Sequence, residues 1–326
     1  MPTSIHDFDY ILPPDRIAQT PAVPRESAKL MVLDRKEKTI THHHVSDLPI
    51  FFRKGDALVV NNTKVFRARL KSGNKELFLL RPVGTKLWQA IGRNISKDMR
   101  IPFADDFVAH VHEKFPDGIL HVSFNQKNVI DFANTYGEVP TPPYIKTIPK
   151  DDEYQTSYAK YVGSVAAPTA GFHFTPAIRE SLKNKGVTIL EITLHVGLGT
   201  FLPIKSETLE EHPIHSEWVD VSAEVSKLIM KAKKEKRRII AVGTTTVRTL
   251  EGTGAKPYQG DVNLFIQPGY KFSVVDNLIT NFHLPKSTLL VLVSAFAGRE
   301  FILNAYKEAV EMGYRFYSFG DAMLIV

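Results

Sequence analysis

The sequence predicts a mixed α/β core domain into which a small β-barrel domain is inserted. After residue 145, apolar strand-like runs alternate with helix-like segments, which is typical of an α/β sheet. Between residues 66 and 145, short strand-like runs instead follow one another, separated by glycine and charged residues. A chain of 326 residues has room for two domains. We therefore assign residues 1–65 and 146–326 to a discontinuous α/β core and residues 66–145 to an inserted, barrel-like domain.

The first thirty residues favour turns over regular structure. Pro13, Pro14, Pro21 and Pro24 break helices, so we expect an ordered surface segment here. Two apolar runs then predict buried strands, at Lys29–Leu33 and at Asp56–Asn61. The second strand delivers Asn61, Asn62 and Thr63 to a turn.

The inserted domain is predicted from four runs of strand-like composition. These strands are expected at Glu76–Arg81, Leu87–Arg93, Phe107–Val111 and Ile119–Phe124. A helix follows near Asn128–Tyr136. Three prolines then predict a stiff connector back to the core, namely Pro140, Pro142 and Pro143.

Helices and strands alternate in the second part of the core. Val225, Leu228, Ile229 and Ala232 recur at helical spacing and predict an amphipathic helix over Ser222–Arg238. We expect two further helices, Thr175–Lys185 and Glu300–Met312, and three strands, Val187–Val196, Ile239–Gly243 and Thr288–Phe296. Another helix is expected to begin near Thr246.

Composition narrows the function without defining it. The chain has no cysteine, which excludes disulfides, thiolate nucleophiles and cysteine-ligated metal centres. The net charge of +6 favours anionic partners such as nucleic acid. No apolar run approaches the roughly 20 residues that cross a bilayer. The first nine residues lack a secretory pattern, so we expect a cytoplasmic protein.

Candidate functional residues lie in loops beside apolar strands, where α/β proteins bind ligands. Ala166–Phe174 (AAPTAGFHF) offers a tight turn with Thr169, Gly171 and His173, and Thr193–Phe201 (TLHVGLGTF) offers His195, Gly197 and Gly199. Ala241–Glu251 (AVGTTTVRTLE) is a strand running into a helix, with Thr244, Thr245, Thr246 and Arg248. We expect threonine side chains to cap this helix and its first amides to form an anion pocket.

Two further loops carry titratable groups. His212–Trp218 (HPIHSEW) holds His215 and Glu217, which suit proton transfer better than metal binding because Pro213 interrupts the spacing. Asp276–Ser287 (DNLITNFHLPKS) brings Asn281 and His283, and the later YSFGD segment brings Asp321, which could equally be a turn former. Consecutive side chains at His42–His44 cannot face one centre in a strand, so no metal site is predicted.

Together these segments resemble one family, the S-adenosylmethionine:tRNA ribosyltransferase-isomerases of queuosine biosynthesis. The resemblance runs in order through Phe8–Pro13 (FDYILP), Arg25–Lys29 (RESAK), Ala57–Leu70 (ALVVNNTKVFRARL), Val165–Phe174, Thr193–Phe201, His215–Glu217, Val242–Glu251, Pro268–Gly269, Val275–Thr288, Ser294–Gly298 and Tyr314–Ile325. Two segments depart from the family pattern. The hairpin at Lys71–Glu76 is shorter than is usual in the family, and the residues at Lys160–Val162 differ from those the family commonly carries.

The resemblance implies a specific reaction. The ribosyl unit of S-adenosylmethionine would move to 7-aminomethyl-7-deazaguanine at the tRNA wobble position, giving epoxyqueuosine, adenine and methionine. S-adenosylmethionine would be consumed as co-substrate, with no resident cofactor, by a monomer. The site residues are then expected as catalytic groups His173, His283, His215, Glu217 and Asp321; S-adenosylmethionine contacts Thr169, Gly171, His195, Gly197, Gly199, Thr244, Thr245, Thr246 and Arg248; and tRNA contacts Arg25, Asn61, Asn62, Lys64, Arg67, Arg69, Arg237 and Arg238.

Two alternatives stay open at this point. A non-catalytic RNA-binding module would carry stacking aromatics interleaved with basic residues on a sheet. A methyltransferase would use the same donor but carry a glycine-rich loop after a first strand, whereas this chain opens with prolines. The basic residues that end the Ser222–Arg238 segment are either a solvated helix end or a phosphate-contacting patch.

Overall fold

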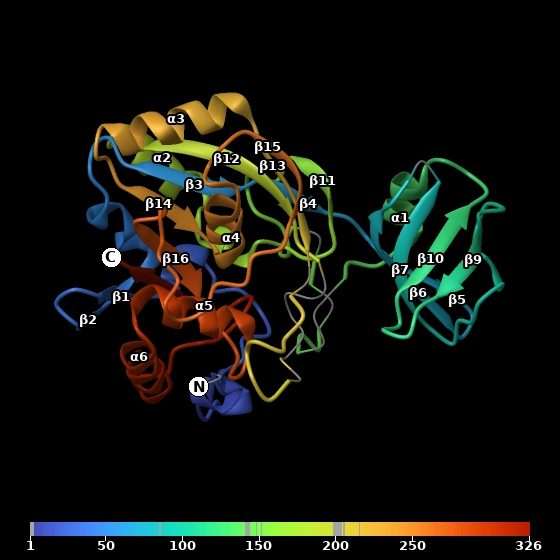
Figure 1. Cartoon of the computed structure of the whole chain (residues 1–326), viewed down its shortest axis with the longest axis horizontal. Helices are drawn as coiled ribbons and strands as arrows, with labels where there is room; N and C mark the ends of the chain where they lie inside the picture. Colours follow the sequence, from blue (N-terminus) through green and yellow to red (C-terminus); the bar gives the residue numbers. More distant parts are fainter. Residues whose placement is uncertain are drawn as a thin grey trace.

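The computed structural model describes residues 3–84, 86–140, 144–147, 149–150, 152–197, 204, 206–214 and 216–326. Within these residues the chain forms a nine-stranded sheet, a six-stranded sheet and a two-stranded ribbon (Figure 1). The predicted mixed α/β class is confirmed. Two predicted site residues, Gly199 and His215, lie outside the described residues.

The nine-stranded sheet is the framework of the core. Its order is β15-β13-β12-β3-β14-β16-β17-β1-β2. The four central strands β12, β3, β14 and β16 are mutually parallel, and β17 and β1 run the opposite way. The strands are β1 (Lys29–Asp34), β2 (Thr39–His44), β3 (Ala57–Asn61), β12 (Thr188–His195), β13 (Glu217–Val221), β14 (Ile239–Val242), β15 (Tyr258–Val262), β16 (Asn277–Asn281) and β17 (Ala322–Ile325).

Both faces of the central strands are buried because successive side chains alternate between two hydrophobic cores. In β3, Ala57 and Val59 pack into one core while Leu58 and Val60 pack into the other. Helices α3 (Ala223–Lys234), α4 (Thr244–Thr253), α5 (Thr288–Ala297) and α6 (Arg299–Glu311) contribute to the first core, and α2 (Pro176–Asn184) contributes to the second. The sheet therefore lies between two helical layers.

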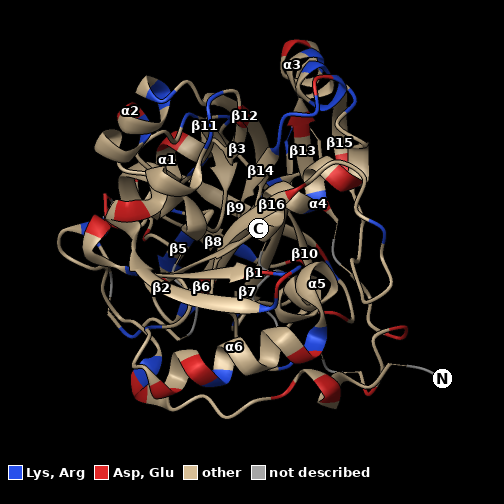
Figure 2. Cartoon of the chain, turned by 90° about the vertical axis from the view of Figure 1, so that its left-hand side faces the viewer, with Lys and Arg blue, Asp and Glu red and all other residues tan. Residues whose placement is uncertain are grey.

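One predicted strand is wrong: Thr288–Phe296 forms helix α5. Nine of the ten residues of α5 are buried, so it is apolar on all sides and shows no helical period in the sequence. Its start is set by Ser287, whose hydroxyl accepts a hydrogen bond from the Leu290 amide at 3.2 Å. Figure 2 shows the contrast with α6, which carries charges of both signs along its length.

Other helix boundaries are close to the predictions, with one consequence for the site. Helix α3 ends at Lys234, so Arg237 and Arg238 follow the helix instead of closing it. The N-terminal segment contains short 3-10 turns and no α-helix among its described residues, as its prolines predict: η1 (Ile5–Phe8), η2 (Pro14–Arg16) and η3 (Arg25–Ser27), with η4 (Val45–Phe51) further on.

The six-stranded sheet has its own hydrophobic core, in which Phe107 and Phe132 stack with ring centroids 4.0 Å apart. Its order is β5-β6-β7-β10-β9-β8, and it is nearly closed because the Ser72 hydroxyl of one edge strand donates to the Pro102 carbonyl of the other. The domain boundaries at residues 66 and 145 stay a prediction. The elements are β5 (Arg69–Ser72), β6 (Lys75–Pro82), β7 (Leu87–Arg93), β8 (Arg100–Pro102), β9 (Val108–Lys114), β10 (Leu120–Phe124) and α1 (Val129–Tyr136).

Two observations complete the fold. Strands β4 (Thr63–Val65) and β11 (Tyr161–Ser164) pair in parallel as the separate ribbon. Among the described residues, no single helix has the length and apolar composition needed to cross a membrane; only α5 and α6 together meet that test, and they are bent by 115°.

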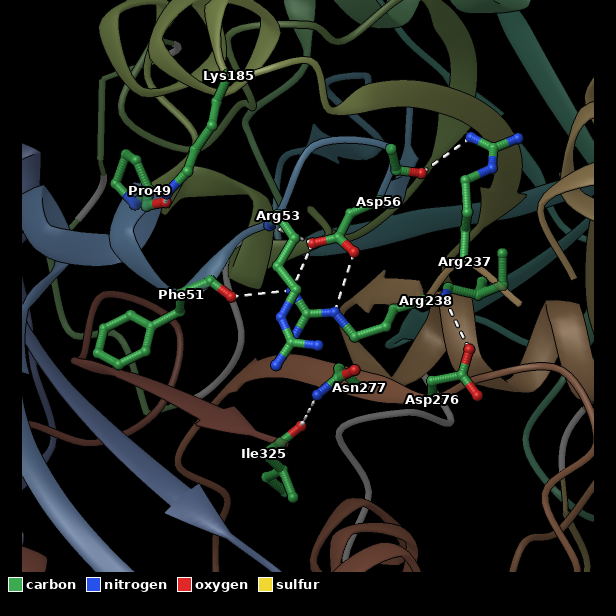
Figure 3. A network of polar contacts seen from close by, with 12 residues as sticks. Pro49, Phe51, Arg53, Asp56, Lys185, Arg237, Arg238, Asp276, Asn277 and Ile325 are labelled. Carbon is green, nitrogen blue, oxygen red and sulfur yellow. Dashed lines mark hydrogen bonds and ion pairs between the residues drawn. The ribbon is translucent and has the colours of Figure 1, made fainter. Parts of the chain in front are cut away.

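A polar network fixes the amino ends of the parallel strands (Figure 3). The buried Asp56 carboxylate, just before β3, accepts hydrogen bonds from Arg238 Nε at 3.0 Å and from the Arg53 amide at 2.7 Å. Asp276, just before β16, accepts one from the Ile239 amide of β14 at 2.8 Å. These contacts hold β3, β14 and β16 in register at one edge of the sheet.

Replacing Asp56 should weaken this sheet specifically. Asp56→Asn leaves Arg238 with an uncompensated charge, so we expect a loss of roughly 3 kcal/mol in unfolding free energy. In a Trp88→Phe background, Trp218 of β13 is the one tryptophan left, and its fluorescence in urea reports on the nine-stranded sheet. Lys231→Gln breaks an exposed pair with Glu235 and should change stability by less than about 0.5 kcal/mol. Equal losses of unfolding free energy in Asp56→Asn and Lys231→Gln would contradict the role of Asp56 in holding the parallel strands in register.

Candidate functional site

The loops singled out in the sequence meet at the opposite edge of the sheet. Because β12, β3, β14 and β16 are parallel, the segments that follow His195, Asn61, Val242 and Asn281 all leave from that edge. Strand β17 runs the other way, with Ala322 paired to Asn281, so the segment before it reaches the same edge.

A cleft of about 470 Å³, open to solvent, lies at this edge. Its lining includes Thr169, Thr244, Thr245, Asn281, His283 and Ser318. A smaller hollow of about 230 Å³ lies beside it, and Ser318 lines both. Arg25, Phe172 and His173 line the smaller hollow. The structure thus brings together four of the predicted loops and the YSFGD segment, from which Ser318 lines the hollows although only Asp321 was singled out there.

His173 is held neutral at this edge. It ends the 3-10 turn η5 (Thr169–His173) and is almost fully buried. Burial, and then the positive charge of Arg25, lower the pKa of His173 to about 4. The neighbouring Asn281 amide opposes this shift, yet among the residues that the structure describes neither His173 Nε2 nor Asn281 Oδ1 has a partner with hydrogen-bond geometry. Two buried polar atoms without partners are costly and suit a site that a ligand completes.

His283 is also neutral but is more firmly held. Burial lowers its pKa to about 3, and its Nε2 lies 3.2 Å from the Thr280 hydroxyl. Its backbone is fixed on both sides, because its amide donates to the Tyr306 hydroxyl and its carbonyl accepts from the Tyr10 hydroxyl. His283 therefore presents a pre-oriented imidazole to the larger cleft.

The amino end of α4 provides an anion-binding feature of the predicted kind, but its cap is not a threonine. Gly243 is the N-cap, with a φ of 87° that favours glycine, and no side chain caps the helix. The threonine hydroxyls turn back instead: Thr246 donates to the Val242 carbonyl and Thr249 to the Thr245 carbonyl. Because the first amides of a helix lack intrahelical partners, this end can bind a carboxylate.

His195 lies in an aromatic stack at the end of β12. Its ring is 4.9 Å from the Trp218 ring at an interplanar angle of 13°, and its Nδ1 lies 2.7 Å from the Thr63 hydroxyl. Burial lowers the pKa of His195 to about 4. The other face of the ring is covered by Gly163, where a Cβ would lie 2.6 Å from His195 Nε2.

Glu217 and Arg248 form a buried ion pair between β13 and α4. Arg248 also donates to the Leu264 carbonyl at 3.1 Å, and Glu217 accepts from the Gly197 amide at 3.4 Å. The pair therefore positions Gly197, one of the predicted ligand-contacting residues. A proton-transfer role for Glu217 and a donor-binding role for Arg248 stay predictions.

Asn61 and Asn62 use their side chains within the sheet. The Asn61 amide exchanges hydrogen bonds with both backbone groups of Leu194, and Asn62 accepts from the Thr193 hydroxyl at 2.8 Å. They fasten the end of β3 to β12 beside His195. Their predicted contacts with tRNA remain untested.

Asp321 also has backbone partners. Its carboxylate accepts hydrogen bonds from the Lys29 amide at 3.0 Å and from the Arg315 amide at 2.7 Å, and it pairs with the Arg315 guanidinium. It thereby ties β1 to the segment before β17. Its catalytic role stays a prediction.

The predicted tRNA-contacting cations fall in three places. Arg25 is at the site, with its guanidinium carbon 4.9 Å from the Phe172 ring centroid. Lys64 is exposed on the ribbon, and Arg67 and Arg69 follow it, where Arg69 pairs with Glu76 at 2.9 Å. Arg237 and Arg238 lie at the opposite edge of the sheet, where they bind the Gly55 carbonyl and Asp56. The structure does not bring this last pair to the site.

Fold and site define a mixed α/β protein whose candidate ligand site lies at the carboxyl ends of its parallel strands. A family model described as "Queuosine biosynthesis protein" matches residues 5–325. Curated proteins named S-adenosylmethionine:tRNA ribosyltransferase-isomerase are 48% identical in Sulfurihydrogenibium sp. (strain YO3AOP1) and 47% identical in Aquifex aeolicus (strain VF5), each covering 99% of both chains. The chain therefore belongs to the queuosine biosynthesis protein family, and the predicted resemblance is confirmed.

A solved structure is similar as well. The crystal structure of an S-adenosylmethionine tRNA ribosyltransferase from Thermotoga maritima matches with a TM-score of 0.58 and 36% identity, covering 98% of this chain and 100% of that one. The mixed α/β architecture with its nearly closed six-stranded sheet is thus shared with a relative.

Gly171 should tolerate no side chain. A Cβ there would lie 2.2 Å from the Tyr158 hydroxyl oxygen and 2.7 Å from Thr156 Cγ2. Gly171→Ala should therefore displace η5 and lower stability by roughly 1–3 kcal/mol in urea unfolding. Adding Tyr158→Phe should restore part of the loss. Gly84→Ala is the matched control, because its nearest neighbour would be 3.9 Å away. Equal stabilities of the two alanine variants would contradict the packing argument.

The lowered pKa values of the buried histidines predict how stability depends on pH. The ordinary pKa is 6.5, whereas His173 titrates near 4 when folded. Below pH 6.5 the unfolded chain binds the additional proton, so stability should be constant above 6.5 and fall as the pH drops towards 4. Urea midpoints of wild type and His173→Gln, measured from pH 7 to 5, should converge as the pH falls. Parallel curves would show that His173 is not buried neutral.

Proposed function

We propose that this chain transfers and isomerises the ribosyl moiety of S-adenosylmethionine onto 7-aminomethyl-7-deazaguanine at the wobble position of tRNA. The products are epoxyqueuosine-tRNA, adenine and methionine. Family membership supports the reaction class. The observation that carries the proposal within the site is the pair of buried, partnerless atoms, His173 Nε2 and Asn281 Oδ1, where the predicted loops converge.

The chemistry needs a base and a donor that stabilises the departing adenine, and a neutral imidazole can accept a proton at one nitrogen and donate a hydrogen bond from the other. The sulfonium acidifies the C5′ hydrogens of the donor, so a base must remove one of them. His173 is the proposed base because its Nε2 is neutral and without a partner. Departing adenine must gain a proton or a hydrogen bond, and His283 in the larger cleft is the proposed donor. Glu217, His215 and Asp321 remain further candidates for proton transfer.

Donor binding is proposed for the edge of the sheet. The methionine carboxylate would meet the first amides of α4 at Thr244–Thr246, and Thr169, Gly171, His195, Gly197, Gly199 and Arg248 would shape the remainder. The donor is consumed, so no resident cofactor or metal is part of the proposal. The tRNA would lie along Arg25, Lys64, Arg67 and Arg69.

The proposal also covers the domain organisation of the chain. Residues 1–65 and 146–326 would form the catalytic domain, and residues 66–145 would be an inserted domain that helps to hold tRNA. The protein would work as a monomer in the cytoplasm.

One incubation tests the reaction. Purified protein, S-adenosylmethionine and tRNA bearing the aminomethyl-deazaguanine should yield free adenine, free methionine and an epoxide-bearing nucleoside by mass analysis. His173→Ala should lower turnover roughly 100- to 10,000-fold, because a base is lost, and should leave the dissociation constant for tRNA nearly unchanged.

The control is His6→Ala, since His6 is an exposed histidine on η1 and should leave turnover as it is. Formation of S-adenosylhomocysteine with a methylated nucleoside would instead identify a methyltransferase. Unchanged turnover in His173→Ala would remove His173 from the mechanism.

A further inference from the structure

The β4–β11 ribbon places an exposed tyrosine next to the site. Tyr161 pairs with Thr63 in register, and Gly163 follows two residues later on the same strand. Register partners on neighbouring strands share a face, so Thr63 and Tyr161 belong to one face, whereas the register shifts at Gly163. Thr63 bonds to His195, and Gly163 lies against the His195 ring. Tyr161 therefore lies beside the residue that contacts His195, and half of its surface is exposed.

Positive charge lies beside this tyrosine and on the neighbouring strand. The Lys160 ammonium lies 5.1 Å from the Tyr161 ring centroid. Lys64 is exposed on the neighbouring strand, where Val162 is its register partner. In the part of the chain that the structure describes, neither lysine has an ion-pair partner. An exposed aromatic ring with unpaired cations beside it suits a base and its phosphates.

We propose that Tyr161 is a stacking platform for one unpaired nucleotide base of the tRNA, with Lys160 and Lys64 binding the adjoining phosphates. The inference rests on the proposed function and specifies how that site holds its RNA. A duplex keeps the faces of its bases covered, whereas a loop can present a base to an aromatic ring. The platform adjoins His195 at the edge of the sheet, so the stacked base would neighbour the nucleotide being modified.

The test measures binding of a fluorescent RNA hairpin with the sequence of an anticodon stem-loop, and of a duplex matching its stem. Tyr161→Ala should weaken binding of the hairpin roughly 5- to 150-fold and leave the duplex unchanged. Tyr161→Phe keeps the ring and should stay within about twofold of wild type. Val162→Ala is the control, because it removes an exposed apolar side chain of the same strand that has no aromatic ring to stack on a base.

The contribution of the two lysines is tested by the salt dependence of RNA binding. The double variant Lys64→Gln, Lys160→Gln should reduce the slope of log affinity against log salt by roughly 1.4, since each phosphate contact to a single strand contributes about 0.7. An unchanged slope would remove these lysines from the interface.

Two outcomes would overturn the stacking role. Hairpin affinity of Tyr161→Ala equal to wild type would exclude it, and so would equal losses in Tyr161→Phe and Tyr161→Ala, which would point to the hydroxyl. Either result leaves the proposed function standing if wild type binds the tRNA and releases adenine. Wild type that does neither would refute the proposed function itself.

Discussion

The parallel alignment of β12, β3, β14 and β16 is the constraint on which the site depends. Parallel neighbours need crossover connections, and those connections place four strand ends and the loops after them at one edge. The other edge is then free for a purely structural network, and Asp56 and Arg238 occupy it. The candidate ligand site and the contacts that fix the strand register therefore lie at opposite edges of the same sheet.

Three histidines near the site edge are buried, and their electrostatics follow from that burial. Burial keeps His173, His195 and His283 neutral, and the positive charge of Arg25 acts in the same direction on His173. A neutral imidazole can accept a proton at one ring nitrogen and donate a hydrogen bond from the other. The cost of partnerless polar atoms such as Asn281 Oδ1 is offset by the large apolar cores that flank the sheet.

The local sequence pattern was sufficient to predict most helices and strands, because apolar runs bounded by turn residues indicate a buried element by themselves. It failed for α5, where burial on all sides removes the period, and for the cap of α4, where Gly243 replaces the expected threonine. The partners of Asn61 and Asn62 lie about 130 residues away in sequence, so no local pattern could reveal their role in the sheet. The reaction itself came from the family resemblance, whereas the two neighbouring hollows, and the place of Ser318 in both, required the structure.

The pairing of β1 with β17 has a consequence for biosynthesis. Lys29 and Asp321, which are hydrogen-bonded beside this pairing, are separated by 292 residues. A ribosome adding about 5–20 residues per second needs roughly 15–60 s to cover that distance. Through this interval the β1–β2 hairpin leaves its inner strand without a neighbour, as an open edge that other nascent chains could join. Because β2 pairs with the other side of β1, the protection of this open edge during translation falls to cellular chaperones.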